Sequence, residues 1–195
     1  MPKQVILITG TPRVGKTSVA TALTSKLQAQ NVNLTELAIS ENLVLRKDQK
    51  RGSIIVSLRR MKKRISQIIR ESAKNSIIID GHYAAQVVPK KLVTWVFVLR
   101  RNPVELRSLM EESGFRGPKL WENLASEILD VCLVDALNAY GPGNVCEIDV
   151  SGRTTEETVN DILAAVKGRS TCYVGIVDWI GRLESQGLLD EYLRI

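Results

Sequence analysis

A glycine-rich segment near the start of the chain has the residue types and the spacing of a phosphate-binding loop. Gly10 to Thr17 read GTPRVGKT, which fits the pattern G-x-x-x-x-G-K-[ST]. Glycines let backbone amides approach a polyphosphate closely, and the start of a helix adds the positive end of its dipole. We expect Lys16 to bridge the β- and γ-phosphates and the Thr17 hydroxyl to ligate the Mg²⁺ that neutralises them.

The residues around this loop favour the same interpretation. Val5 to Ile8 form an apolar run of strand length, and Ala20, Leu23 and Leu27 recur at helical spacing after the loop. A plain glycine turn between a strand and a helix is the alternative. If the loop holds phosphates, the nucleotide-binding residues are Gly10, Pro12, Arg13, Val14, Gly15, Lys16, Thr17 and Ser18.

An aspartate at the end of an isoleucine run is the second candidate for chemistry. Asp80 follows Ile77–Ile79, and P-loop proteins keep the acid that holds Mg²⁺, directly or through water, at such a strand end. A turn or a helix cap is the alternative, because Asp-Gly is a common turn dipeptide. The next residue is Gly81, where motor and helicase ATPases usually carry a glutamate, and no N-K-x-D segment is present to read guanine.

The only histidine of the chain, His82, lies two residues beyond this aspartate. On an extended chain its side chain projects on the same side as that of Asp80. A catalytic role, orienting the acceptor or an attacking water, and a purely structural role are both open.

Three arginines could stabilise the charge that spreads over a transferring phosphoryl group. A kinase without an arginine from a partner protein needs such cations of its own. Arg100 ends an apolar strand. Arg107 precedes the glycine-containing junction Ser113–Gly117, which we interpret as the tip of a lid, and Arg116 lies within it. We predict a catalytic role for Arg116 and nucleotide contacts for Arg100 and Arg107; a solvated surface position is the alternative for the two helical arginines.

The elements that must position these residues alternate along the chain. Short apolar runs separated by helical patterns are typical of parallel strands buried on both faces. The sequence therefore predicts an α/β fold: a doubly wound, five-stranded parallel sheet flanked by helices, with the site at the carboxyl ends of the strands. The five strands are expected near residues 5–8, 32–34, 76–79, 92–99 and 145–150.

Helical patterns and turn signals suggest the domain organisation. We expect helices at residues 34–43, 57–74, 103–112 and 118–140, and a last one that begins with the capping box Thr154–Glu157. The polar stretch 46–52 is a candidate acceptor-binding flap or a surface loop. We predict one P-loop domain at residues 1–168, with an acceptor-binding region about 31–57 and a lid about 112–122. The apolar tail 172–195 is expected to be a helical extension docked on the core, or an element that binds a partner.

The excess positive charge of the chain is confined to one segment. Of the formal net charge of +6, all arises between Ser57 and Lys74, where seven basic residues face a single acid, Glu71. Leu58, Met61, Ile65, Ile68 and Ile69 give the same segment an apolar stripe at helical spacing. The segment is therefore an amphipathic helix whose wet side is either simply solvated or meets the phosphates of a nucleotide or of RNA.

The remaining composition indicates an intracellular, soluble, cytoplasmic protein. No charged and apolar leader precedes Val5, and the longest apolar runs are far shorter than a membrane span. Cys132, Cys146 and Cys172 are widely spaced and form no C-x-x-C motif, so we expect buried free thiols in a reducing compartment.

Taken together, these motifs resemble those of the adenylate kinase isoenzyme 6 family, a family of small kinase/ATPases of archaea and eukaryotic nuclei. The resemblance covers most of residues 4–168. It rests on GTPRVGKT at residues 10–17, IIIDGH at 77–82, VFVLRRNPVEL at 96–106 and GFRGPKLWENLASEI at 114–128. The chain departs from that family in Arg13, where a glycine is usual, in Ser113, where an arginine is usual, and in Val56–Arg60, which replaces an acidic cluster.

The resemblance implies a nucleoside-monophosphate-kinase-like P-loop fold and an AMP:ATP phosphotransferase with a slow ATPase side activity. It implies ATP and Mg²⁺ as cofactors, AMP or another nucleoside monophosphate as acceptor, and Asp80 and His82 as the acid and histidine of the family's second motif. It also implies partners in small-subunit ribosomal RNA processing, namely rRNA and a small-subunit ribosomal protein, and no membrane. A nucleotide-gated ribosome assembly factor with little kinase activity, or a kinase for another small metabolite, are the alternatives.

Overall fold

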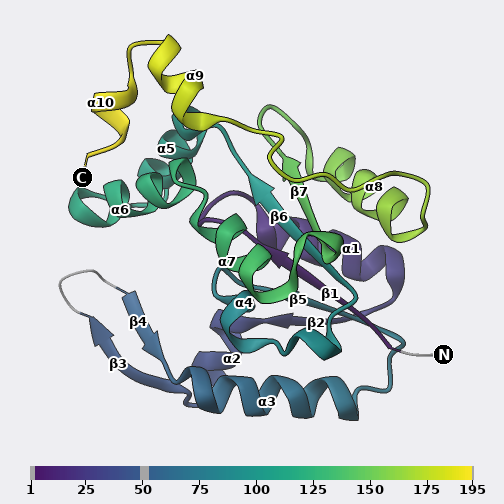
Figure 1. The fold of residues 1–195 in the computed structure, drawn as a ribbon. Coiled ribbons are helices and arrows are strands. Elements are labelled where there is room, and N and C mark those ends of the chain that lie inside the picture. Colours follow the sequence, from purple (N-terminus) through teal and green to yellow (C-terminus); the bar gives the residue numbers. More distant parts are fainter. Residues whose placement is uncertain (1–2, 49–52, 195) are drawn as a thin grey trace.

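A five-stranded parallel sheet forms the centre of the molecule. The computed structural model describes residues 3–48 and 53–194. The strand order is β2-β5-β1-β6-β7, and every neighbouring pair is parallel (Figure 1). The predicted α/β fold is therefore confirmed. The strands are β1 (Gln4–Thr9), β2 (Gln30–Asn33), β5 (Ser76–Asp80), β6 (Trp95–Arg100) and β7 (Val145–Asp149).

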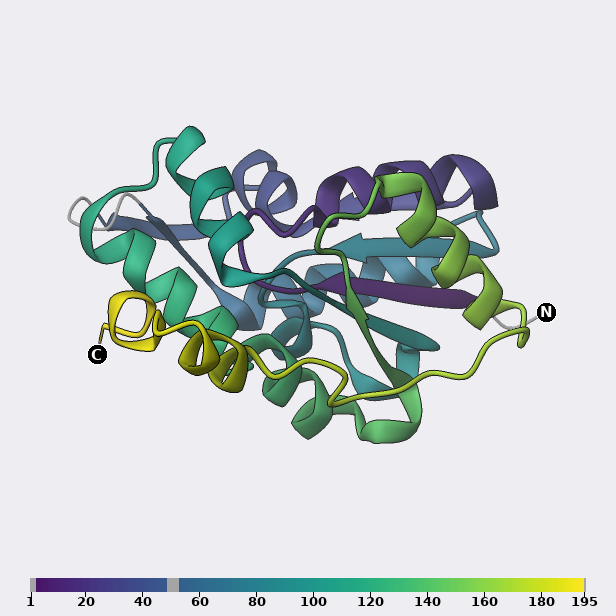
Figure 2. The same cartoon turned by 90° about the horizontal axis from the view of Figure 1, so that it is seen from above.

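Helices cover both faces of this sheet. Figure 2 shows α1 and α8 on one face and α7 on the other. The helices are α1 (Lys16–Leu27), α2 (Leu34–Ser40), α3 (Leu58–Glu71), α4 (Ala84–Val87), α5 (Pro103–Glu112), α6 (Gly117–Ile128), α7 (Val131–Tyr140), α8 (Thr155–Val166), α9 (Trp179–Ser185) and α10 (Leu189–Tyr192), and short 3-10 turns lie at Lys90–Leu92 and Pro142–Asn144. The predicted capping box of Thr154 and Glu157 is present at the start of α8.

The alternation of side chains along the strands divides the core into two layers. In β1, Ile6 and Ile8 face α1, α5, α6 and α8, whereas Val5 and Leu7 face α3, α4 and α7. Both faces of each central strand are buried, which explains why these strands are continuous apolar runs. The polar residues that follow the strands are thereby brought to one edge of the sheet, where Asn33, Asp80, Arg100 and Asp149 end their strands.

The region predicted as an acceptor-binding flap contains a hairpin that the sequence pattern did not indicate. β3 (Val44–Asp48) and β4 (Ser53–Val56) pair antiparallel, with a register shift between Val44 and Arg46. Of the two alternatives for residues 46–52, the surface loop is wrong where the structure describes the chain, and the acceptor-binding flap stays a prediction; residues 49–52 lie outside the described residues. A two-stranded ribbon buries little apolar surface, so it leaves a weak hydrophobic pattern.

The single helix predicted over residues 118–140 is wrong, because the chain breaks between α6 and α7. Asp130 has a φ of 57°, a left-handed conformation that interrupts an α-helix. The Arg100 guanidinium donates a hydrogen bond of 2.8 Å to the Glu127 carbonyl and another to the Asp130 carboxylate. These bonds satisfy groups at the carboxyl end of α6, where the helix itself offers no donors.

The carboxyl-terminal extension docks on α5 and α6. Its Trp179, Leu183 and Tyr192 join the core layer that contains α5 and α6, and Figure 1 shows α9 and α10 beside these two helices. In the described ranges 3–48 and 53–194, no helix has the length and hydropathy needed to cross a membrane.

The expectation of three free thiols is wrong for two of the cysteines. Cys146 of β7 and Cys172 form a disulfide with a Cα–Cα distance of 4.9 Å, while Cys132 is free. After α8 the chain runs back along β7, where the Glu147 amide donates to the Tyr173 carbonyl at 2.9 Å. The fold thus brings together two cysteines that are 26 residues apart, and their spacing in the sequence gives no sign of it.

Gly10 gives the first prediction. Its φ is +135°, and a Cβ at this position would collide with the Leu99 carbonyl oxygen and lie 3.1 Å from Val14 Cγ2. We expect Gly10→Ala to lower the free energy of unfolding by about 2 kcal/mol or more, because strain and overlap add. Urea unfolding measures the change. Gly143→Ala is the control, since a Cβ there meets nothing within 4 Å; equal stabilities of the two variants would contradict the argument.

Candidate active site

The phosphate loop lies between β1 and α1, as its sequence predicts. Gly10, Arg13 and Gly15 all have positive φ angles, of 135°, 73° and 111°. Arg13 therefore adopts the left-handed conformation that glycine favours, at a cost of about 1 kcal/mol for a residue with a Cβ. Gly15 caps α1 without a side-chain hydrogen bond. The first amides of α1 therefore have no side-chain acceptor at the cap, which leaves them available to an anion.

Lys16 is folded back onto its own loop. Its Nζ donates a hydrogen bond of 2.7 Å to the Thr11 carbonyl, and the residue is 9% exposed. Desolvation by burial lowers the pKa of Lys16 to about 8, although the charges of Asp80 and Glu127 act in the opposite direction. Burial of the charged ammonium group thus costs desolvation free energy, which an anion bound in the loop would offset.

Thr17, Asp80 and Asn33 form a polar cluster beside the loop. Asp80 Oδ2 accepts hydrogen bonds from Thr17 Oγ1 at 2.8 Å and from Asn33 Nδ2 at 3.0 Å. Its other oxygen, Oδ1, is buried without a hydrogen-bond partner in the described residues. Burial raises the pKa of Asp80 above its ordinary value, although the Thr17 bond and the Lys16 charge lower it. A buried carboxylate oxygen without a donor indicates a place for a cation.

The donor set of this cluster fits Mg²⁺. Mg²⁺ prefers oxygen ligands and usually takes one or two from the protein, with the rest from phosphates and water. Thr17 and Asp80 supply a hydroxyl and a carboxylate next to the loop. Over residues 3–48 and 53–194 no group of three or more His, Cys, Asp or Glu side chains is arranged to hold a metal. The predicted pair is therefore of the kind that binds a metal together with a nucleotide.

His82 lies in a turn and not on an extended strand. β5 ends at Asp80, the Ala84 amide donates to the Gly81 carbonyl at 3.2 Å, and the ring of His82 meets that of Tyr83 edge-on at 5.0 Å. The prediction that His82 projects beside Asp80 assumed an extended chain, and the turn removes that premise. Desolvation, followed by the charge of Lys16, lowers the pKa of His82, so its imidazole is neutral at pH 7.

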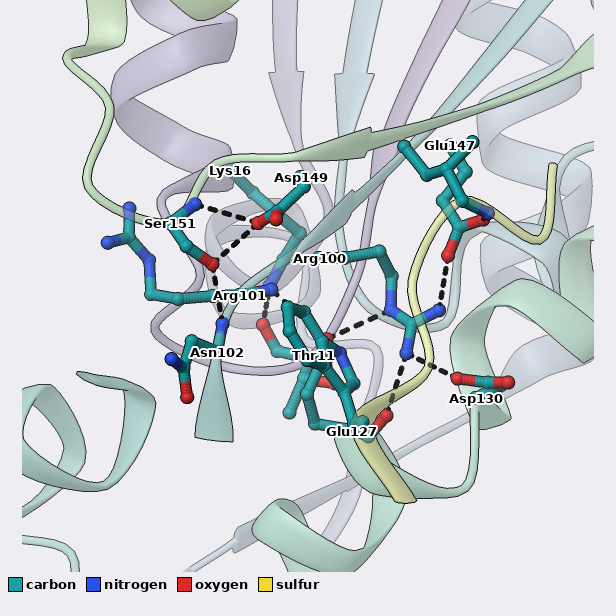
Figure 3. Close-up of polar contacts among 12 residues, drawn as sticks. Thr11, Lys16, Arg100, Arg101, Asn102, Glu127, Asp130, Glu147, Asp149 and Ser151 are labelled. Carbon is teal, nitrogen blue, oxygen red and sulfur yellow. Dashed lines mark hydrogen bonds and ion pairs between the residues drawn. The ribbon is translucent and has the colours of Figure 1, made fainter. Parts of the chain in front are cut away.

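Arg100, predicted to contact the nucleotide, is instead buried among carboxylates. Its Nε donates to Glu127 Oε1 at 2.9 Å and its Nη1 to Glu147 Oε1 at 2.5 Å, and Nη2 pairs with Asp130 (Figure 3). The guanidinium is about 1% exposed. The prediction of a direct nucleotide contact for Arg100 does not hold in this arrangement, because its donors are already used within the core.

Arg107 and Arg116 are also engaged within the lid and the extension. Arg107 forms ion pairs with Glu111, at 3.1 Å, and with Glu191 of α10, and its guanidinium lies about 5 Å from the ring centres of Trp121 and Tyr192. Hydrogen bonding to Glu191 raises the pKa of Arg107. Arg116 Nη1 donates to two backbone carbonyls of its own lid, at 2.5 and 2.6 Å. Both arginines would have to leave these partners to reach a nucleotide.

A cavity of about 390 Å³ opens on the loop and extends beyond it. Its lining does not include Arg100, Arg107 or Arg116, all of which lie in the described part of the chain. The cavity is lined by Arg13, Val14, Gly15, Lys16, Thr17, Ser18, Val19, Arg101, Leu109, Val150, Arg153, Thr154, Thr155 and Thr158. The lining thus combines residues of the loop with residues of the turn after β7 and of α8, and most of these residues are polar.

Sequence reasoning missed two cationic residues of this lining, Arg101 and Arg153. Arg101 pairs with Glu105 at 2.9 Å, and its Nε is buried without a partner in the described chain; Arg153 pairs with Asp161 at 2.6 Å. A signal was present in both cases. Arg101 directly follows a strand end, and Arg153 follows the last strand, which lies next to β6. In a parallel sheet the loops at these ends approach the site.

Comparison with known proteins agrees with this geometry. The family model described as an AAA domain (AAA_18) matches residues 6–130. Over 174 residues the chain is 34% identical to a protein of Methanocaldococcus jannaschii named "Putative adenylate kinase", covering 89% of this chain and 92% of that relative. A Pyrococcus furiosus protein of the same name is 35% identical over 175 residues, covering 90% and 91%. The chain belongs to this adenylate-kinase-like family.

The solved structures extend the similarity at the level of the fold. A sugar kinase from Janibacter sp. HTCC2649 superposes with a TM-score of 0.57 at 15% identity, covering 87% of this chain and 99% of that one. The adenylate-kinase-like family thus shares its P-loop architecture with kinases of other substrates. At this level of identity the likeness shows the fold alone, so the acceptor has to be argued from the site.

The buried charge of Lys16 gives a second prediction. We expect Lys16→Met to stabilise the nucleotide-free protein at pH 7 by about 1–3 kcal/mol, because a desolvated ammonium group is replaced by an apolar chain of similar length. The gain should shrink between pH 8 and pH 10.5. In that range the unfolded chain keeps a proton on Lys16 that the folded protein has lost, so the wild-type protein gains stability as pH rises.

Urea unfolding at pH 7 and pH 10 measures both effects. Lys26→Met, on the exposed side of the same helix, is the control and should change stability by less than about 0.5 kcal/mol. A Lys16→Met protein that is less stable than wild type at pH 7 would show that the ammonium group is well compensated.

Proposed function

We propose that this protein transfers the γ-phosphoryl group of ATP to a nucleoside monophosphate, with AMP favoured, in a Mg²⁺-dependent reaction. A cavity lined both by the phosphate loop and by the turn after β7 supports this proposal, together with the hydrogen bond from Thr17, which lines the cavity, to Asp80. The names of the archaeal relatives support a nucleotide acceptor over a sugar.

In this proposal the loop binds the phosphates through its backbone. The first amides of α1 and the Lys16 ammonium group bind the oxygens of the β- and γ-phosphates, and Lys16 leaves the Thr11 carbonyl to do so. Thr17 and Asp80 hold Mg²⁺, which neutralises phosphate charge. The chain thereby aligns the γ-phosphorus with an acceptor oxygen and stabilises the charge that develops on the equatorial oxygens.

The remaining residues of the proposal bind the nucleoside and the acceptor. Arg101 and Arg153 lie along the cavity, where they can flank the base and ribose of ATP. We retain Arg107 and Arg116 as lid cations that engage the phosphates after the lid closes, and His82 as a neutral residue that orients the acceptor or a water. The hairpin β3–β4 belongs to the proposed acceptor-binding region 31–57.

We further propose that the protein is a member of a specific kinase family and has an ATPase side activity. The resemblance in the loop, the Asp80 strand and the lid supports the adenylate kinase isoenzyme 6 family, and with it a slow ATPase activity in the absence of acceptor. Water can reach a phosphoryl group whenever no acceptor excludes it. We propose a cytoplasmic protein that acts on ATP and AMP.

An assay with a panel of acceptors tests this function. Purified protein is incubated with ATP and Mg²⁺, alone and with AMP, GMP, CMP or UMP, and the nucleotides are separated by chromatography. We expect ADP formation to rise most strongly with AMP. Lys16→Met should lower the rate by about 100-fold or more, because a preorganised cation is lost, while Lys26→Met should not. If the rate of ADP formation were the same with and without each acceptor, the protein would be an ATPase, and the proposed kinase activity would be contradicted.

A second candidate function rests on the basic face of α3. Arg59, Arg60, Lys62, Lys63 and Arg70 are exposed. Lys62 and Arg70 also line a hollow of about 400 Å³ together with Lys91. Arg64 is excluded from this face, since its Nε bonds both Glu41 oxygens, at 2.6 and 2.8 Å. We propose that this face binds RNA phosphates. In this proposal the protein takes part in small-subunit ribosomal RNA processing, with rRNA and a small-subunit ribosomal protein as its partners.

Charge reversal tests the RNA proposal. Arg60→Glu, Lys63→Glu and Arg70→Glu in one protein should weaken binding to a single-stranded RNA and reduce the slope of log K against log salt by about 2, because each lost phosphate contact removes about 0.7. The control reverses Lys26, Lys167 and Arg169, which changes the net charge equally on the α1–α8 side. Identical slopes for the two triple variants would exclude α3 as the binding face.

A further inference from the structure

The carboxylate of Glu127 in α6 joins three segments of the chain. Its Oε2 accepts a hydrogen bond of 2.5 Å from Thr11 Oγ1 of the phosphate loop. Its Oε1 accepts from Arg100 Nε at 2.9 Å, from the Arg101 amide at 3.1 Å and from Trp179 Nε1 of the extension at 3.1 Å. Glu127 itself is 1% exposed. Figure 3 shows the Arg100 guanidinium pointing toward Glu127 and Asp130.

Charge balance with Arg100 does not account for this arrangement. Arg100 also pairs with Glu147 and Asp130, so the guanidinium has two further carboxylates. Of the four side-chain and backbone groups that donate to the Glu127 carboxylate, three are neutral. A carboxylate that takes bonds from a loop hydroxyl, a strand-end amide and an indole holds those groups in a fixed relation to one another.

Thr11 connects the Glu127 carboxylate to the phosphate loop. The residue is buried, its carbonyl accepts hydrogen bonds from Lys16 Nζ and from the Val14 amide, and its hydroxyl is held by Glu127. Arg101 is the corresponding point on the other side, because its amide is held by the same carboxylate while its side chain lines the cavity.

Trp179 brings the carboxyl-terminal extension to the same carboxylate. It is the first residue of α9 and is 2% exposed. The segment before it is fixed to β7 by the Cys146–Cys172 disulfide and by a hydrogen bond of 2.9 Å from the Ile176 amide to Glu147 Oε2. The extension therefore reaches the phosphate loop through one shared hydrogen-bond acceptor.

We infer that Glu127 is a positioning residue: it holds the conformation of the phosphate loop through Thr11 and the position of Arg101 at the nucleoside side of the cavity. Through Trp179, this conformation also depends on the docked extension. The inference rests on the proposed nucleotide site but concerns its organisation and not its acceptor. The extension then acts as part of the nucleotide site although its described residues, 172–194, do not line the cavity.

Trp179→Phe tests the inference with little change in packing, because it removes the N–H donor and keeps a ring. We expect the affinity for ADP, measured by calorimetry, to fall about three- to tenfold, as one hydrogen bond to a charged group is lost. Amide hydrogen exchange in residues 10–17 should become faster, whereas the KM for AMP should not change. Trp95→Phe, at the opposite end of β6, is the matched control and should leave both measurements unaltered.

Two further variants separate positioning from charge. Asp130→Asn removes one carboxylate from Arg100 without contact to Thr11 or Trp179, and asparagine tolerates the positive φ at this position. Glu127→Gln should weaken ADP binding and speed exchange in the loop more than Asp130→Asn does. If Trp179→Phe matches Trp95→Phe, or if Asp130→Asn matches Glu127→Gln, the inference is overturned. Neither ADP calorimetry nor amide hydrogen exchange requires phosphoryl transfer, so these two measurements still decide the inference if the kinase assay fails.

Discussion

A guanidinium group buried at the end of the central sheet must be matched by carboxylates, and the structure around the site depends on this requirement. Arg100 comes from β6, Glu147 from the neighbouring strand β7, Glu127 from α6, and Asp130 from the break that follows it. Removing one partner of such a cluster leaves a buried charge without compensation. The cluster therefore fixes the carboxyl end of α6 to the ends of β6 and β7, and Glu127 and Glu147 also bind the carboxyl-terminal extension.

Local signals in the sequence predicted the parts of the site that are local in the chain. The loop, the aspartate at the end of β5 and the capping box of α8 each depend on residues close in sequence, and the structure has all three elements where the pattern placed them. The alternation of apolar runs and helices likewise predicted the parallel sheet, because strands buried on both faces are mostly apolar.

The features that the sequence did not reveal depend on contacts between distant residues. The sequence pattern of an arginine at a strand end next to a phosphate loop predicts a phosphate ligand. Only the fold shows that three carboxylates surround Arg100. The Cys146–Cys172 disulfide and the break at Asp130 also depend on contacts between residues that are far apart in the sequence. Arg101 and Arg153 were missed because their role depends on which strand ends are neighbours.

In the proposed function, one cavity accepts the whole donor nucleotide, with its phosphates in the loop. A crystal structure of the protein with ADP and Mg²⁺ tests this binding mode. We expect both phosphates on the amides of Gly15–Ser18, Lys16 released from the Thr11 carbonyl, and the base between Arg101 and Arg153. Diphosphate density outside the Gly10–Thr17 loop, with Lys16 still bound to Thr11, would contradict it.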